Sequence, residues 1–237
     1  MNVLKPKYRT KEVLESIKEC LDIGWTGLGF KTVEFENAWK EYTGLQNAHF
    51  INSNTSGLHL AVKILKSVNK WKNGDEIITT PLTFVSTNHA IKYENLTPVF
   101  ADVDNQLCLD PESVEALITK KTRAVMFVGI GGNIGQYDAI VELCKKHKLK
   151  LILDAAHMAG TKKKIGFEYG YTTQHIGQDA DVSIFSFQAV KNLPTADSGM
   201  ICFKNDDYDE LARKMSWLGI DKDTFSRTNS KGTYKWD

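Results

Sequence analysis

The chain lacks several features that would assign it to whole classes of protein. It has no apolar run long enough to cross a membrane, and its first residues contain no apolar signal core. Charge of one sign is not in excess, since 30 Lys and Arg residues face 29 Asp and Glu residues. This balance argues against a nucleic acid or a membrane surface as partner. We therefore expect a cytoplasmic protein that binds neither.

Cysteine is scarce and scattered. The four cysteines are far apart and form no Cys-x-x-Cys pair: Cys20, Cys108, Cys144 and Cys202. This spacing favours reduced, buried thiols over a disulfide framework. No motif in the chain calls for a metal.

Apolar, β-branched runs alternate with segments of helical period between residues 46 and 219. Repeated strand–helix–strand order with continuous apolar strands predicts an α/β fold, a mostly parallel central sheet with helices on both faces. We expect strands at 48–53, 76–81, 97–103, 123–130, 149–155, 180–187 and 199–203. We expect helices at 58–68, 84–93, 111–118, 137–147 and 207–218.

The two ends of the chain differ from this central α/β domain. Residues 1–45 predict a helix, a glycine loop and a second helix that pack on the domain outside its sheet. Residues 220–237 are polar and irregular, and we expect them to lead out of the domain. The predicted organisation is therefore 1–45, 46–219 and 220–237.

Asp154 and Lys191 each follow a segment that has the pattern of a buried strand. A carboxylate and an amine at the ends of neighbouring strands are what pyridoxal phosphate needs. The lysine forms a Schiff base with the aldehyde, and the aspartate keeps the pyridine nitrogen protonated. Each residue also has an ordinary interpretation: Asp154 could cap the next helix, and Lys191 could extend from a turn into solvent.

Other candidate residues follow strands at the same predicted edge, where ligands of open α/β sheets collect. Thr55 and Ser56 open a helix and suit a phosphate, although an ordinary helix cap is the commoner use of such residues. Phe84 could stack on a flat ring, although most aromatic side chains belong to cores. His157 and Ser186 complete the group beside Asp154 and Lys191.

A run of glycines at 129, 131, 132 and 135 provides a competing interpretation. It follows a strand, precedes a helix and is followed by Asp154 at the end of the next strand. This imitates a dinucleotide-binding fingerprint and would indicate an oxidoreductase. The spacing is G-x-G-x-x-x-G, however, and the hypothesis leaves Lys191 and the 54–57 loop without a role. Pyridoxal phosphate is therefore favoured.

Five motifs occur in the order typical of one known family: 52–57, 81–87, 98–104, 153–157 and 185–192. From about residue 24 to about residue 219, the chain resembles the DegT/DnrJ/EryC1/StrS family of pyridoxal-phosphate sugar aminotransferases. Within that family it is most similar to enzymes that aminate the 4-keto group of UDP-linked sugars. The resemblance implies the large domain of a fold type I pyridoxal-phosphate transferase.

The resemblance also implies a role for each candidate. Lys191 would be the Schiff-base lysine and proton carrier, Asp154 would pair with the pyridine nitrogen, and Phe84 would stack on the ring. His157 would lie on the oxygen side of the ring. The phosphate would be held by Thr55, Ser56 and Ser186. The sugar site would include the loop residues Trp25, Thr26, Gly29 and Phe30.

The implied reaction moves an amino group from glutamate to a nucleotide-linked keto-sugar, and the implied assembly is a homodimer with sites at its interface. Three departures from the family stand out. Gly129 replaces a usual histidine, Asp197-Ser-Gly199 replaces Glu-Gly-Gly, and relatives run well beyond 237 residues into a small domain.

These departures leave a second possibility, a large domain that binds the cofactor but is catalytically incomplete. A related dehydratase is disfavoured, because those enzymes carry histidine where Lys191 stands.

Overall fold

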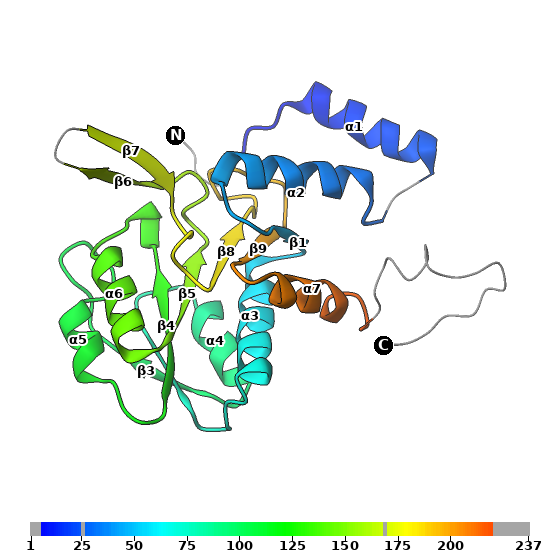
Figure 1. Cartoon of the computed structure of the whole chain (residues 1–237). Coiled ribbons are helices and arrows are strands. Elements are labelled where there is room, and N and C mark those ends of the chain that lie inside the picture. The colour runs from blue at the N-terminus through cyan, green and yellow to red at the C-terminus, as the bar shows by residue number, and fades with distance from the viewer. Residues whose placement is uncertain (1–5, 25–26, 168–169, 220–237) are drawn as a thin grey trace.

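The computed structural model describes residues 6–24, 27–167 and 170–219, and its centre is a seven-stranded sheet (Figure 1). The strand order is β1-β9-β8-β5-β4-β2-β3. Strands β3, β2, β4, β5 and β8 pair in parallel, whereas β9 is antiparallel to both β8 and β1. The predicted mostly parallel sheet is thus confirmed. Its strands are β1 (His49–Ile51), β2 (Glu76–Thr79), β3 (Thr97–Phe100), β4 (Thr122–Val128), β5 (Lys150–Ala155), β8 (Val182–Ser186) and β9 (Gly199–Phe203).

Helices cover both faces of this sheet, as predicted. Successive residues of β4 alternate between two apolar cores, because side chains of a strand point to opposite faces. One core is closed by α2 (Phe30–Thr43), α5 (Pro111–Ala116) and α6 (Tyr137–His147). The other is closed by α3 (Asn54–Val68), α4 (Ser86–Tyr93) and α7 (Asp206–Met215). Figure 1 shows α5 and α6 on one side of the strands and α3 and α7 on the other.

The first helix, α1 (Thr10–Ile23), lies outside these layers, beyond α2 in Figure 1. None of its residues is buried. In contrast, α2 belongs to the fold, because Trp39 is only 2% exposed and packs with Phe185 and Phe187. Among the described residues, no helix is both long and apolar enough to span a membrane.

A cluster of charged side chains joins α2 and α7 to the strand that leads into the site. The Glu36 carboxylate accepts the Phe50 backbone N–H (2.7 Å) and pairs with Arg213 (3.0 Å). Arg213 also pairs with Asp209 (2.7 Å) and donates to the Ala48 carbonyl (2.7 Å). Since Glu36 is 7% exposed, these contacts compensate for the burial of its charge. They hold β1 in place immediately before the functional residues that follow it.

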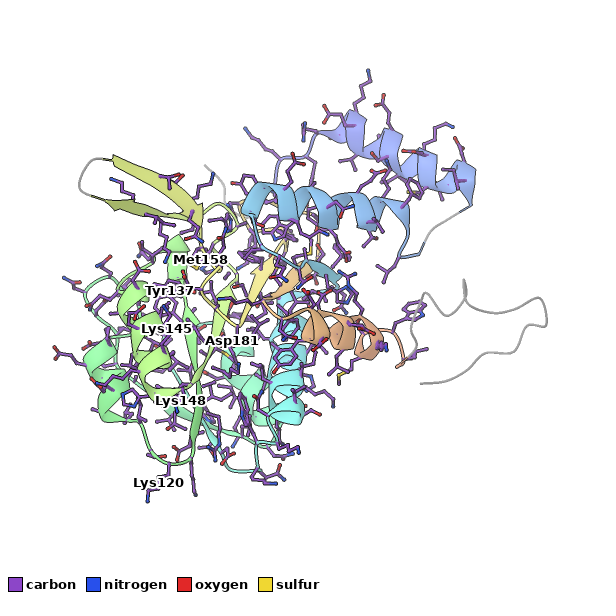
Figure 2. The ribbon with its side chains drawn as sticks, in the orientation of Figure 1. Lys120, Tyr137, Lys145, Lys148, Met158 and Asp181 are labelled. Carbon is purple, nitrogen blue, oxygen red and sulfur yellow. The ribbon has the colours of Figure 1, made fainter. Side chains whose placement is uncertain are left out.

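Strands β1, β2, β5 and β8 all end at the same edge of the sheet. β1 and β8 run in the same direction because both are antiparallel to β9, and β8 continues the parallel set. Figure 2 shows the two edges: Lys120 and Lys148, which precede β4 and β5, lie at one edge, and Met158, which follows β5, lies at the other. The candidate residues were expected at this carboxyl edge.

Two local predictions differ from the structure. An antiparallel hairpin of β6 (Lys162–Phe167) and β7 (Gly170–His175) was not predicted. The glycine run does not open a helix directly. Residues Ile130–Gly132 form a single 3₁₀ turn, and α6 begins only at Tyr137. In a dinucleotide fingerprint the glycine loop leads directly into the helix whose N-terminus binds the pyrophosphate.

Candidate active site

A cavity of about 520 Å³ lies at the carboxyl edge of the sheet, a volume in the usual range for small-molecule sites. It brings together side chains that follow four different strands. Six of the predicted site residues line it: Thr55, Phe84, Asp154, His157, Ser186 and Lys191. The ordinary interpretations of Asp154 as a plain helix cap and Lys191 as a plain surface lysine are therefore disfavoured.

Asp154 ends β5 and is only 4% exposed. Its carboxylate accepts hydrogen bonds from the Thr87 hydroxyl (2.7 Å), the Ala156 backbone N–H (3.2 Å) and the Asn54 amide (3.4 Å). Burial raises the pKa of Asp154, and these three neutral donors only partly oppose that shift. No lysine, arginine or histidine forms an ion pair with it among the described residues. A cationic N–H in the cavity would supply the missing counter-charge.

Lys191 lies in the loop between β8 and β9, where its backbone N–H donates to the Gln188 carbonyl (2.8 Å). Partial burial lowers the pKa of its amine, and the negative charge of Asp154 opposes that shift. A lowered pKa increases the fraction of neutral amine, which is the form that attacks an aldehyde.

The start of α3 forms the third side of the cavity. Ser53 caps the helix by accepting the Ser56 N–H (3.2 Å), which leaves Thr55 exposed to the cavity. This turn lies against the sheet because Gly57 and Gly199 have no side chains. A Cβ on Gly57 would come within 2.3 Å of Ile51, and one on Gly199 within 2.7 Å of a backbone carbonyl oxygen. Free N–H groups at a helix N-terminus favour an anion such as phosphate.

Phe84 and His157 complete the lining. Phe84 is 76% exposed, so it is not a core residue, and its ring is available for stacking. The Nδ1 atom of His157 accepts the Gly131 backbone N–H (3.0 Å). Partial burial lowers the pKa of His157, the positive charge of Lys191 lowers it further, and Asp154 opposes both.

Other predicted residues do not line this cavity. Ser56 bonds to its neighbours Asn52 and Ser53 and faces a second cavity beside α7. Gly29 and Phe30 lie at the N-terminus of α2 and are absent from the lining. Trp25 and Thr26 are outside the described residues.

The structure adds residues to which the sequence assigned no role. Thr87 and Asn54 hold the Asp154 carboxylate, and Asn54 also donates to the Ile184 carbonyl (3.0 Å). Gln188 and Asp197 line the cavity. The four-residue spacing of Thr83 and Thr87, which places two hydroxyls on one helical face, was the only available signal for Thr87.

This set of groups fits pyridoxal phosphate. A partly neutral lysine, a buried carboxylate without a cationic partner, an exposed aromatic ring and hydroxyls at a helix start match its aldehyde, pyridine nitrogen, ring and phosphate. Within the described part of the chain, no group of three or more His, Cys, Asp or Glu side chains is placed to hold a metal.

An α/β fold that places an amine and a buried carboxylate in one cavity at the carboxyl edge has the architecture of a pyridoxal-phosphate transferase. Comparison with known sequences agrees. Residues 7–234 match the DegT/DnrJ/EryC1/StrS aminotransferase family, to which the chain therefore belongs.

Known relatives extend this result. The spore coat polysaccharide biosynthesis protein SpsC of Bacillus subtilis is 36% identical over 96% of this chain. A structure of DesI with its TDP-sugar product is 28% identical over 94% of the chain, with a TM-score of 0.80. The putative sugar aminotransferase Spr1654 of Streptococcus pneumoniae, in its PLP form, is 25% identical over 98%, also with a TM-score of 0.80. The chain spans only 56%, 54% and 59% of these proteins, respectively.

Proposed function

We propose that this protein is a pyridoxal-phosphate-dependent aminotransferase that transfers an amino group from glutamate to a nucleotide-linked keto-sugar. The observation that carries the proposal is the shared cavity of Lys191 and Asp154. The sugar substrate is supported by the relatives, one of which is crystallised with a TDP-sugar.

Each residue of the cavity has a defined task in this proposal. Lys191 binds the cofactor aldehyde and later moves a proton at the substrate carbon that gains or loses nitrogen. Asp154 keeps the pyridine nitrogen protonated, and Phe84 covers one ring face. Thr55 and Ser186 hold the phosphate. The bound cofactor supplies the electron sink that makes this proton mobile.

The loop 24–30 is proposed to contact the sugar, and a second copy of the chain is proposed to complete the site as a homodimer. Because the chain spans little more than half of its relatives, a second candidate function is a domain that binds the cofactor without turnover. The two candidates share the cofactor and differ only in whether glutamate reacts.

Covalent trapping tests the shared part. Pyridoxal phosphate is added, the adduct is reduced with borohydride, and the intact mass is measured. Wild-type protein should carry one pyridoxyl group and Lys191→Ala none. Lys145→Ala, which removes an exposed lysine of α6 paired with Glu142, is the matched control and should behave as wild type. Equal labelling of Lys191→Ala and wild type would refute the proposal.

The amino-donor reaction separates the two candidates. If the chain is a competent transaminase, glutamate should convert the bound cofactor to its amine form and release one equivalent of 2-oxoglutarate. A subsequent keto-sugar nucleotide should restore the aldehyde form. Cofactor attachment without any 2-oxoglutarate would favour the incomplete domain.

A further inference from the structure

The glycine turn 129–132 packs directly on the segment that carries His157. The Gly129 N–H donates to the Asp154 carbonyl (3.3 Å), and the Thr161 hydroxyl donates to the Gly132 carbonyl (3.1 Å). A Cβ on Gly129 would lie 2.0 Å from the Met158 sulfur, and one on Gly132 would lie 3.2 Å from the His157 carbonyl oxygen. Both glycines are therefore explained by contact with residues 154–161, without any nucleotide.

The third glycine of the turn contacts the imidazole itself. Gly131 adopts φ +62°, a left-handed conformation that glycine accepts readily, and its N–H donates to His157 Nδ1 at 3.0 Å. A backbone N–H can only donate. Nδ1 must therefore carry a lone pair, and the hydrogen of the neutral ring must be on Nε2.

The charges around the ring favour the same state. An imidazolium would place an N–H on Nδ1 against the N–H of Gly131. It would also lie near the Lys191 amine, whose positive charge adds to burial in lowering the pKa of His157. Asp154 is the one opposing charge. The Nε2 atom has no hydrogen-bond partner among the described residues, and the ring lines the cavity.

We propose that the glycine turn 129–132 is a positioning element that holds His157 as the neutral Nε2–H tautomer. The ring then presents a hydrogen-bond donor to an oxygen acceptor in the cavity. The identity of that acceptor, an oxygen of the cofactor or of the substrate, rests on the proposed function, whereas the tautomer does not. His157 becomes a donor of fixed direction, and the glycine run gains a role that is independent of dinucleotides.

The hydrogen bond can be observed directly by NMR on the cofactor-free, ¹⁵N-labelled chain. An N–H···N bond transmits a ¹⁵N–¹⁵N coupling, so near neutral pH we expect a cross-peak between the Gly131 amide and His157 Nδ1. His157→Gln, which lacks Nδ1, assigns the signal by losing it. A hydrogen found on Nδ1 in the wild-type protein, or no coupling to Gly131, would overturn the proposal.

A pair of glycine variants tests whether the turn is responsible. Gly131 and Gly74 both have positive φ (+62° and +82°), and in both cases a Cβ would meet no atom within 4 Å. Valine strains both backbones, because β-branched residues avoid this region. Gly131→Val should abolish the coupling and move the His157 titration up toward its ordinary range. Gly74→Val should leave both unchanged, and an unchanged His157 in Gly131→Val would refute the assignment.

The donor role has its own readout in cofactor affinity. A glutamine at 157 can accept from Gly131 through its oxygen and donate into the cavity through its nitrogen, whereas leucine can do neither. His157→Leu should weaken pyridoxal-phosphate binding by roughly tenfold, the usual effect of one hydrogen bond, and His157→Gln should stay near wild type. Equal weakening in both variants would contradict the donor role. If the wild type binds no cofactor, the proposed function fails while the NMR result stands.

Discussion

At the scale of single residues, Asp154 shows how a site can cost stability. Its carboxylate is buried against neutral donors only, so the folded chain holds a charge that it does not fully compensate. Pre-organised sites often carry such costs, because the missing partner belongs to the ligand.

We expect Asp154→Asn to stabilise the cofactor-free protein at neutral pH. Because burial raises the pKa of Asp154 in the folded state, wild-type stability falls as pH rises from the unfolded pKa to the folded pKa. The near-isosteric amide has no such titration. Urea unfolding at several pH values should therefore show an advantage of the variant that grows from acid to neutral pH.

Asp75→Asn is the matched control with the opposite sign. The pKa of Asp75 is lowered, chiefly by its hydrogen bond from Arg123, and the ion pair measures 2.8 Å. Its stabilising effect is present above the unfolded pKa and is lost as pH falls, so Asp75→Asn should destabilise the protein at neutral pH. If both variants shift stability in the same direction, the account of Asp154 is wrong.

Two buried threonines give a second prediction. Thr87 and Thr79 are both fully buried, but only Thr87 donates to Asp154, while the Thr79 hydroxyl has no hydrogen-bond partner among the described residues. Replacing Thr87 with valine should cost about 1–3 kcal/mol of unfolding free energy, because a buried carboxylate loses a donor. Thr79→Val should be nearly neutral or stabilising in the same denaturation experiment. Comparable losses would show that methyl packing, not the hydrogen bond, decides.

At the scale of elements, the cavity depends on turns that lie closer to one another than side chains would permit. The turn after β4 meets the turn after β5 through Gly129 and Met158. Here the chain departs from its family, whose members usually have a histidine at the position of Gly129. The Met158 sulfur fills the space that a side chain at 129 would need.

A double-mutant cycle tests this packing. Gly129→Ala should destabilise by about 1–3 kcal/mol through overpacking, although its φ of −87° suits alanine. In a Met158→Ala background the same change should cost less than about 0.5 kcal/mol, because the space is now empty. Gly27→Ala, where a Cβ would meet nothing within 4 Å, controls for the substitution itself. Additive costs in the cycle would rule out the contact.

At the scale of the whole molecule, the core ends at α2. Helix α1 presents an apolar stripe of Val13, Leu14, Ile17 and Leu21, and each of these side chains is 43–60% exposed. Opposite it lie charged residues that pair with one another, such as Lys18 and Asp22. Alone, α1 adds little to the buried surface.

Ile17 and Ile64 provide the corresponding prediction. Both lie on apolar faces of helices, but Ile17 is 49% exposed and Ile64 is fully buried. Ile64→Ala should cost about 2–5 kcal/mol and Ile17→Ala less than about 1 kcal/mol in thermal or urea unfolding. A concentration-dependent cost at Ile17 similar to that at Ile64 would instead show that another copy of the chain buries α1 in solution.

The sequence by itself determined the class of fold and the composition of the site. Continuous apolar strands alternating with helical segments predicted a mostly parallel sheet with two helical layers, and strand ends identified Asp154 and Lys191. Pattern was sufficient because hydrophobic periodicity and the direction of parallel strands are local or topological properties. The β6–β7 hairpin was missed because its segment Lys162–Phe167 begins with three lysines and lacks apolar alternation.

Only the tertiary structure decided how each residue is used. The exposure of Phe84, the neutral donors around Asp154 and the bond from Gly131 to His157 depend on segments far apart in sequence. Their chemistry is set by burial and by distances of about 3 Å, which no periodicity encodes. The glycine run makes the difference plain. Its spacing alone imitated a nucleotide site, and its contacts in the folded chain assign it to the histidine of the cavity.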